Sequence, residues 1–262
     1  MLASREGEPT LACPDFYLGC AGPDPYFYDV YPPTPFVRSR TDLGRKLHHI
    51  PGRELFDGVL SAMKPEDVPF AAGLLCHFCL DAAAHPYVYA RQEEIGHTQM
   101  EVVLDMQVHK AHKEELGELY DLQEGANLAA IDGYMSRLVE ALTGEKTEGV
   151  YRRSARKFRR LHLLSRDPRG TKRRLARRLE GPLGLKKSLS GYMYTQGIAD
   201  ERDFLNKNHA SWAPFGKGAM NHRDSFLDLF NQGLDLCREA LPLLLKGDGK
   251  GLCTLTGERM MY

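Results

Sequence analysis

The sequence predicts an all-α protein folded as a single domain. Several long segments carry apolar residues at helical spacing, and no stretch shows sustained period-two alternation of β-branched residues. The 262 residues are enough for one large domain with a buried core, and no internal repeat divides them. Hydrophobic residues make up 42% and charged residues 27%, which excludes disordered, collagen-like and coiled-coil classes.

The first forty residues differ from the rest because they are rich in proline, glycine and aromatic residues, as in PDFYLGCAGPDPYFYDVYPPTPF. This composition predicts an ordered loop over a core rather than a long helix. The first fifteen residues, MLASREGEPTLACPD, lack a basic patch followed by an apolar core, so we expect no secretory signal in them. No apolar run approaches the ~18 residues that span a bilayer. Six scattered cysteines are too few for a disulfide framework, so we expect a reducing, cytoplasmic protein.

From Thr41 onward the pattern is helical, and the segments with the clearest apolar periodicity predict five helices. The first has Pro65 near its start and is expected to end at His85, because Pro86 disfavours further α conformation. The five expected helices cover about residues 65–85, 92–119, 127–142, 192–203 and 225–245.

The segment from Tyr151 to Lys187 departs in charge, with fifteen lysines and arginines against two acidic residues in a chain of zero net charge. A solvated, flexible connection between helices explains such a run. The alternative is a weak contact with an anionic membrane surface or with nucleic-acid phosphates. Only Tyr151 and Phe158 could stack on bases, so a nucleic-acid partner is not expected.

Ligand-type side chains recur along the apolar helix at 65–85, where His77, Asp81 and His85 stand at i, i+4 and i+8. Residues four apart lie on one helical face, and burying three such groups without partners would cost several kcal/mol by rough estimate. The next helix repeats the spacing with His97 and Glu101. Imidazoles and carboxylates in this mixture predict a metal site, suited to zinc, with manganese, iron or nickel as competitors.

Two upstream elements could complete such a site. Asp24 lies in a GPDP turn, whose prolines restrict the backbone and could direct a carboxylate inward. His48 and His49 follow each other before Pro51, and their own spacing does not separate them. The cysteines of the CxxC beside His77 lie inside a helix, so we interpret both as small core residues.

Four segments together resemble the zinc-dependent phospholipase C family, also called phospholipase C/D domain proteins, and especially its small cytoplasmic bacterial branch. The segments are FYLGCAGPDPYFYD, LGRKLHH, GLLCHFCLDAAAHPYVY and GHTQMEVVLD. The resemblance covers about residues 15–105 and extends more faintly, through FLNKNHASWAP, toward residue 245. It implies an all-helical, phospholipase C/P1 nuclease-like architecture.

The resemblance also implies two zinc ions held by seven ligands. The first ion would be held by Asp24, His48, His77 and Asp81, and the second by His85, His97 and Glu101. The family places its ligand after the leucine of LGxxLH, which selects His48 over His49. Asp24 would also orient or deprotonate the attacking water. A third ion, bridged by Asp81, would need an early histidine, and no histidine precedes His48 in this chain.

The resemblance therefore implies a metal-dependent hydrolase of phosphodiester bonds, whose substrate is a phospholipid headgroup or another small phosphodiester. Two alternatives remain open. One is a metal-binding scaffold or sensor without catalysis, and the other is a nuclease-type phosphoesterase.

Overall fold

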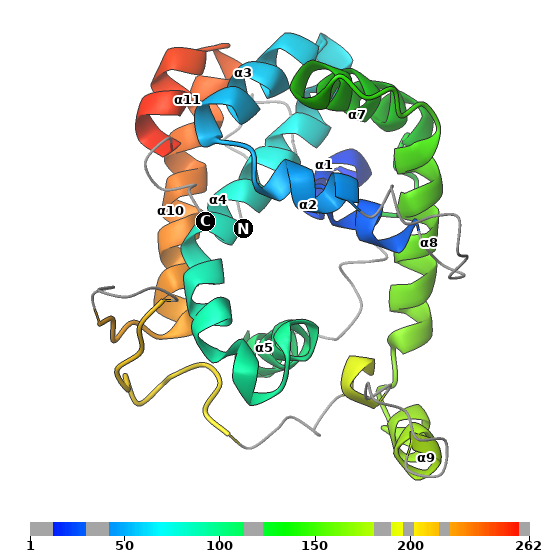
Figure 1. Ribbon diagram of the computed structural model, residues 1–262, viewed down its shortest axis with the longest axis vertical. Coiled ribbons are helices and arrows are strands. Elements are labelled where there is room, and N and C mark those ends of the chain that lie inside the picture. Colours follow the sequence, from blue (N-terminus) through cyan, green and yellow to red (C-terminus); the bar gives the residue numbers. More distant parts are fainter. Residues whose placement is uncertain are drawn as a thin grey trace. The chain divides into compact units, whose positions relative to one another are not determined.

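Helices make up almost all of the regular structure in the computed structural model, which describes residues 13–29, 42–112, 123–180, 190–195, 202–214 and 221–256 (Figure 1). The all-α class is confirmed: within these ranges the β-type pairings are two isolated bridges. In chain order the elements are α1 (Pro14–Gly19), η1 (Asp24–Tyr28), α2 (Asp42–His48), α3 (Gly52–Ala62), η2 (Pro65–Asp67), α4 (Val68–Arg91), η3 (Gln92–Glu94), α5 (His97–His112), α7 (Leu128–Thr143), α8 (Val150–Ser165), α9 (Thr171–Glu180), η4 (Ser190–Tyr192), α10 (Phe226–Leu245) and α11 (Gly249–Thr256).

The helices expected at 127–142 and 225–245 are confirmed as α7 and α10. Helix α7 begins after Asn127, whose side chain accepts a hydrogen bond from the backbone N–H of Ala130 at 3.2 Å. It ends at Gly144, whose φ of 73° is the left-handed conformation that closes many helices. Local capping chemistry explains why these bounds could be predicted.

Helix α4 continues past Pro86 to Arg91, so the expected end at His85 is wrong. Proline removes one backbone hydrogen bond from a helix, at a cost of about 3 kcal/mol. The next turn buries Tyr87 and Val88, with 0% and 4% of their surface exposed, and this burial offsets the cost.

The stretch Pro65–Glu94 is long and apolar enough to cross a membrane by length and composition, which the search for apolar runs in the sequence did not anticipate. In the structure, 61% of its most apolar window is buried inside the protein. The stretch is therefore a core helix in this fold.

Two other expected helices differ from the structure. The helix expected at 92–119 begins as η3 and restarts as α5 at His97, because Gly96 has a φ of 90° that no α-helix contains. The helix expected at 192–203 is wrong for its described residues. There the backbone of Tyr194 pairs with Ser165 and Asp167 instead, and residues 196–201 lie outside the described part of the chain.

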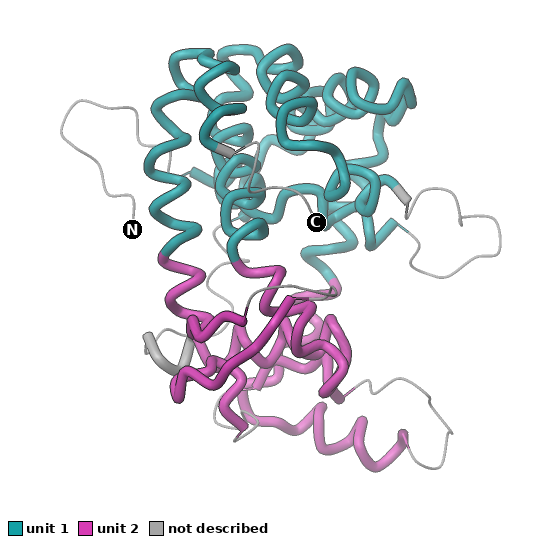
Figure 2. Tube along the Cα trace, turned by 60° about the vertical axis from the view of Figure 1, so that its left-hand side comes forward, with its two compact units in different colours: residues 1–83, 119–160, 232–262 teal, residues 84–118, 161–231 magenta. Residues whose placement is uncertain are grey.

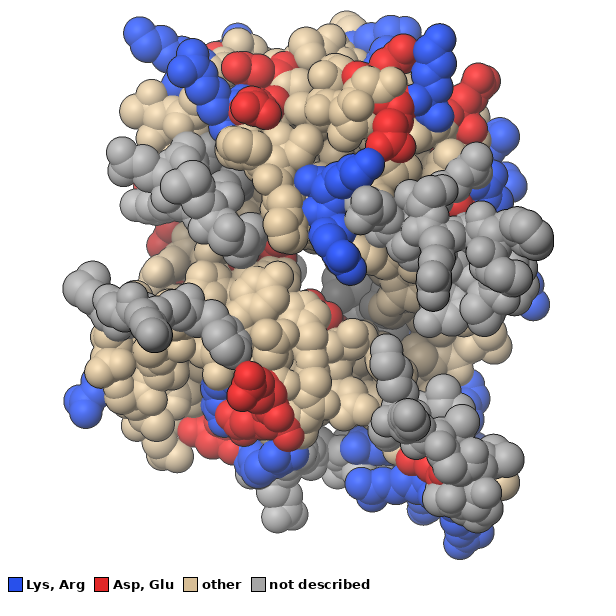
Figure 3. All heavy atoms as spheres, viewed as in Figure 1, with Lys and Arg blue, Asp and Glu red and all other residues tan. Residues whose placement is uncertain are grey.

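The described part of the basic segment, 151–180, is not a flexible connection, because it forms most of α8 and all of α9. Asp132 caps α8, accepting hydrogen bonds from the backbone N–H groups of Gly149 at 2.6 Å and Arg152 at 2.9 Å. Figure 3 shows lysine and arginine side chains gathered over α9 at its lower right. Residues 181–187 lie outside the described part.

The chain divides into two compact units, coloured separately in Figure 2. Unit 1 comprises residues 1–83, 119–160 and 232–262, and unit 2 comprises residues 84–118 and 161–231. Helices α4, α8 and α10 each contribute residues to both units.

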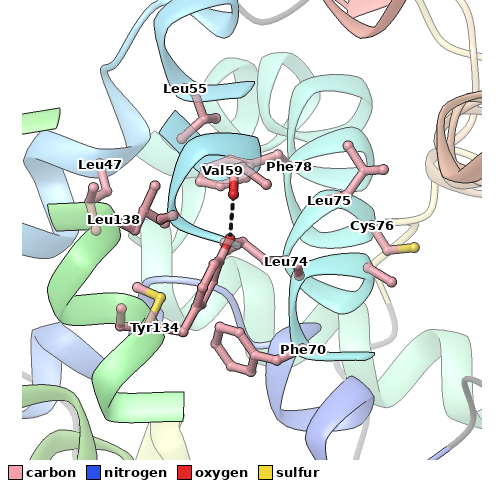
Figure 4. Close-up of a cluster of buried hydrophobic side chains, with 14 of the residues drawn as sticks. Leu47, Leu55, Val59, Phe70, Leu74, Leu75, Cys76, Phe78, Tyr134 and Leu138 are labelled. Carbon is pink, nitrogen blue, oxygen red and sulfur yellow. Dashed lines mark hydrogen bonds between the residues drawn. The ribbon is translucent and has the colours of Figure 1, made fainter. Parts of the chain in front are cut away.

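The core of unit 1 forms where α3, α4 and α7 bring their apolar faces together (Figure 4). Tyr134 is fully buried, and its hydroxyl donates to the backbone carbonyl of Val59 at 3.4 Å. The labelled core residues are Leu47, Leu55, Val59, Phe70, Leu74, Leu75, Cys76, Phe78, Tyr134 and Leu138. Cys76 and Cys79 are 5% and 0% exposed, as expected of small core residues.

Helix α1 lies directly against α4 at a crossing that two glycines allow. A Cβ atom at Gly19 would stand 3.0 Å from the Cα atom of Gly73, and one at Gly73 would stand 2.8 Å from the backbone nitrogen of Cys20. Larger residues would force the two backbones apart. This close approach positions the loop after α1, which carries part of the site described below.

Unit 2 has its own core, built around α5, the second part of α4 and the loop 202–214. Tyr87 anchors this loop, because its hydroxyl donates to the backbone carbonyl of Phe204 at 2.6 Å. The rings of Trp212 and Tyr87 pack edge to face with centroids 5.2 Å apart. A loop without regular structure is thus held by buried aromatic residues.

Candidate metal centre

Three ligand-type side chains of unit 1 meet at one point. The donor atoms of Asp24, His48 and His77 all lie within 4.8 Å of one another. Nε2 of His48 is 3.2 Å from Oδ1 of Asp24 and 3.3 Å from Nε2 of His77. Tetrahedral ligands placed ~2.0–2.2 Å from a zinc ion lie roughly 3.3–3.6 Å apart, so the spacing fits one shared ion.

Each of these residues comes from a different helix. Asp24 begins the helix η1 directly after Pro23, and Pro25 restricts the following turn. His48 is the last residue of α2, and His77 lies in the middle of α4. The sequence brings them together because η1 and α2 pack on each other within unit 1.

Both histidines are oriented by backbone carbonyls. Nδ1 of His48 donates to the carbonyl of Gly44 at 2.7 Å, and Nδ1 of His77 donates to that of Cys20 at 3.3 Å. Because a carbonyl oxygen can only accept, each ring carries a proton on Nδ1 and directs Nε2 to the meeting point. A carbonyl or carboxylate partner of this kind orients most histidines that bind metals.

The contact between His48 and Asp24 shifts the pKa of both groups. Burial lowers the pKa of His48, but the hydrogen bond and the charge of Asp24 outweigh it and raise the pKa to about 9. Burial alone would raise the pKa of Asp24, yet the hydrogen bond from His48 and the nearby imidazoles hold it below its ordinary value. The site therefore already stabilises positive charge beside a carboxylate, as a cation site must.

Gly22 allows His77 its position. Its φ of 54° lies in the left-handed region, and a Cβ atom there would stand 2.8 Å from Nε2 of His77 and closer still to ring carbons. The carbonyl of Gly22 accepts a hydrogen bond from the buried hydroxyl of Tyr151 at 2.9 Å, which holds the loop in place. Sequence reasoning missed this glycine and both orienting carbonyls, because none of them carries a ligand-type side chain.

Two further expected ligands are placed differently. His49 is exposed, and its Nδ1 donates to the carbonyl of Arg45 at 3.0 Å, away from the group. Asp81 does not join the three gathered donors, although its negative charge raises the pKa of both Asp24 and His48. Among the described residues, the structure thus brings three of the four expected ligands of the first ion together.

A second group lies in unit 2 and contains the three other expected ligands, His85, His97 and Glu101, again within 4.8 Å of one another. Oε1 of Glu101 is 3.3 Å from Nε2 of His97 and 3.8 Å from Nε2 of His85. The two imidazoles stack with centroids 5.5 Å apart and planes inclined by 20°. Helix α4 contributes His85, and α5 contributes the other two residues from its first two turns.

Neighbouring side chains orient the second group as well. Nδ1 of His97 donates a hydrogen bond to Oε1 of Gln92 at 3.1 Å, which directs Nε2 toward Glu101. The ring of Tyr89 stacks on His97 at 5.3 Å between centroids. Gln92 was not predicted as a partner of His97, because the helical periodicity does not show that the helix breaks at Gly96 between them.

Each group therefore offers two imidazoles and one carboxylate, a donor set that could hold a divalent metal ion. Three protein ligands leave a further coordination position open to a water molecule or a substrate, as in catalytic rather than structural sites. The chemistry available at such a position is polarisation of an oxygen atom in water or in a bound substrate. Comparisons with family models, with curated proteins and with solved structures find no match to this chain.

Proposed function

We propose that the chain is a metal-dependent phosphodiester hydrolase that binds zinc, with a phospholipase C/P1 nuclease-like architecture. The proposed substrate is a phospholipid headgroup or a related small phosphodiester. The six cysteines are free thiols, which supports a reducing, cytoplasmic location as part of the same proposal.

The observation that carries the proposal is the convergence of Asp24, His48 and His77, with both Nε2 atoms directed at one point by backbone carbonyls. A purely structural cluster would not need both imidazoles held in the tautomer that leaves Nε2 available. The second group repeats the donor set and the oriented histidine, which supports two sites of the same chemistry.

When bound, zinc would lower the pKa of a coordinated water toward ~7 and neutralise charge on phosphoryl oxygens. The side chain of Asp24 remains 42% exposed, so its carboxylate can accept a hydrogen bond from an attacking water. Its lowered pKa keeps it ionised at neutral pH, which suits an acceptor that orients the water. His48 and His77 would hold the ion together with this carboxylate.

The test is metal content by elemental analysis together with hydrolysis of the chromogenic substrate bis(p-nitrophenyl) phosphate by zinc-loaded protein. The first variant is His48→Ala, and His49→Ala is its matched control, because the two residues are adjacent and only His48 faces Asp24. We expect His48→Ala to lose one zinc per chain and its hydrolytic activity. His49→Ala should retain both.

Each alternative has its own outcome in this experiment. Zinc that binds at both groups without any hydrolysis would favour a metal-binding scaffold or sensor. Hydrolysis that is inhibited by single-stranded nucleic acid but not by phosphorylcholine would favour a nuclease-type phosphoesterase. Equal zinc content in both variants would contradict the assignment of His48.

A further inference from the structure

An exposed apolar stripe runs along α9 in unit 2. Leu175 and Leu179, four residues apart on one face of this helix, are 59% and 48% exposed. Leu164, at the end of α8, is 56% exposed. Together with Phe27 and Leu245, these are the large apolar side chains that the described part of the chain leaves most open to solvent.

The surroundings of this stripe are strongly basic. Residues 161–180 contain seven lysines and arginines against two acidic residues, Asp167 and Glu180. The carboxylate of Asp167 is buried and accepts the backbone N–H groups of Thr171 and Arg173 at the start of α9. That of Glu180 accepts hydrogen bonds from Ser190. Both acids are occupied locally, so the outward face of α9 carries mainly positive charge.

The helical geometry places the cations around the leucines. At 100° per residue, Lys172 and Arg178 fall on opposite sides of the stripe formed by Leu175 and Leu179. Arg173 lies on the opposite face of the helix, where its guanidinium is 3.3 Å from the hydroxyl of Thr195. The leucines therefore point away from the rest of unit 2. Arg178 flanks them on one side, and on the other side the ammonium of Lys172 donates to the backbone carbonyls of Leu164 at 2.8 Å and Arg166 at 2.9 Å, at the end of α8.

We propose that α9 is an interfacial helix, which lies on an anionic lipid surface with its leucines in the headgroup region. Basic side chains attract anionic headgroups. Exposed leucines lower the free energy of binding only where they leave water. Nucleic-acid phosphates would attract the same arginines but would give the leucines no apolar partner. Helix α9 also contains no aromatic residue for base stacking. The inference does not depend on the proposed hydrolase activity.

The test measures sedimentation of the full chain with phosphatidylcholine vesicles, with and without about 30% phosphatidylserine. One variant, Arg174→Gln with Arg178→Gln, removes two exposed cations of α9. Each lysine or arginine near such a surface changes binding roughly fivefold, so we expect a loss of about 25-fold. A second variant, Leu175→Ser with Leu179→Ser, keeps the charge and should lose about tenfold.

The matched control is Arg156→Gln with Arg160→Gln, which removes the same charge from exposed positions of α8 at the same spacing. This control should bind within about twofold of the unchanged protein, and about 0.5 M salt should abolish binding of all forms. Three results would overturn the proposal. The first is equal binding to neutral and anionic vesicles, and the second is an equal loss of binding in the α8 control and the α9 arginine variant. The third is that the leucine variant binds like the unchanged protein while duplex DNA displaces the protein from the vesicles.

Discussion

Replacing Gly22 by alanine tests whether the loop between α1 and η1 positions the metal ligands. A Cβ atom there would stand 2.8 Å from Nε2 of His77 and closer to the ring carbons, whereas carbon atoms in contact lie ~3.5–4.0 Å apart. The imidazole would therefore have to move by about 1 Å. Metal–ligand distances tolerate only about 0.2 Å, so the ring would leave its place in the site.

The matched control is Gly144→Ala at the end of α7. Its φ of 73° carries a similar backbone strain, but a Cβ atom there meets nothing within 4 Å. Left-handed strain alone costs about 1 kcal/mol in the free energy of unfolding of the metal-free protein. Overpacking adds about 1–3 kcal/mol for Gly22→Ala.

The decisive measurement is zinc affinity by competition with a chromophoric chelator, alongside urea unfolding of the metal-free proteins. We expect Gly22→Ala to weaken zinc binding at this group by about 100-fold, as loss of a supporting neighbour does in other metal sites. Gly144→Ala should bind zinc like the unchanged protein. Equal affinities in the two variants would refute the argument that Gly22 makes room for His77.

Three further predictions concern charge and orientation. In the metal-free protein the pKa of His48 is raised to about 9, so protonated His48 adds to the free energy of unfolding. This contribution is complete below pH 6.5 and is lost as the pH rises through 9. The lowered pKa of Asp24 adds a contribution that is present above its ordinary value of 3.8. Urea unfolding from pH 6 to 10 should therefore show falling stability, and a rising curve would contradict the sign. Arg137→Ala should cost about 2–3 kcal/mol in thermal unfolding, because it removes the charged partner of the buried carboxylate of Asp67 at 2.6 Å and leaves it the backbone N–H of Lys64 at 2.9 Å. A loss under about 0.5 kcal/mol would contradict this. Gln92→Ala should weaken zinc binding at the second group about tenfold in the chelator assay, and no change would show that the amide is not needed.

The all-α class and the ligand-type spacings on two neighbouring helices could be predicted because both depend on local periodicity. The assignment of His85, His97 and Glu101 to one ion came from the family resemblance. His97 and Glu101 are one helical turn apart, so their shared face follows from the spacing alone. His85 joins them from α4, which continues to Arg91 although the sequence pattern around Pro86 predicted an end at His85. Tertiary burial of Tyr87 outweighed the local preference of proline in that case.

The first ligand group depended on packing that periodicity does not report. Asp24 and His48 are 24 residues apart in the sequence, and only the contact between η1 and α2 brings them together. The choice between His48 and His49 rests on which ring turns inward, since both donate Nδ1 to a carbonyl four residues earlier. Asp81 shows the limit of the same reasoning, because a shared helical face with His77 did not bring it into the group.

The crossing of α1 and α4 has a consequence for anyone who would rebuild this site in another helical scaffold. Grafting Asp24, His48 and His77 alone would transplant the donors without the space they occupy. Gly19 and Gly73 let two backbones touch, and that contact delivers the Cys20 carbonyl to His77. A successful graft must therefore include both glycines as well as the three ligands. A design that scores only ligand geometry would not retain them.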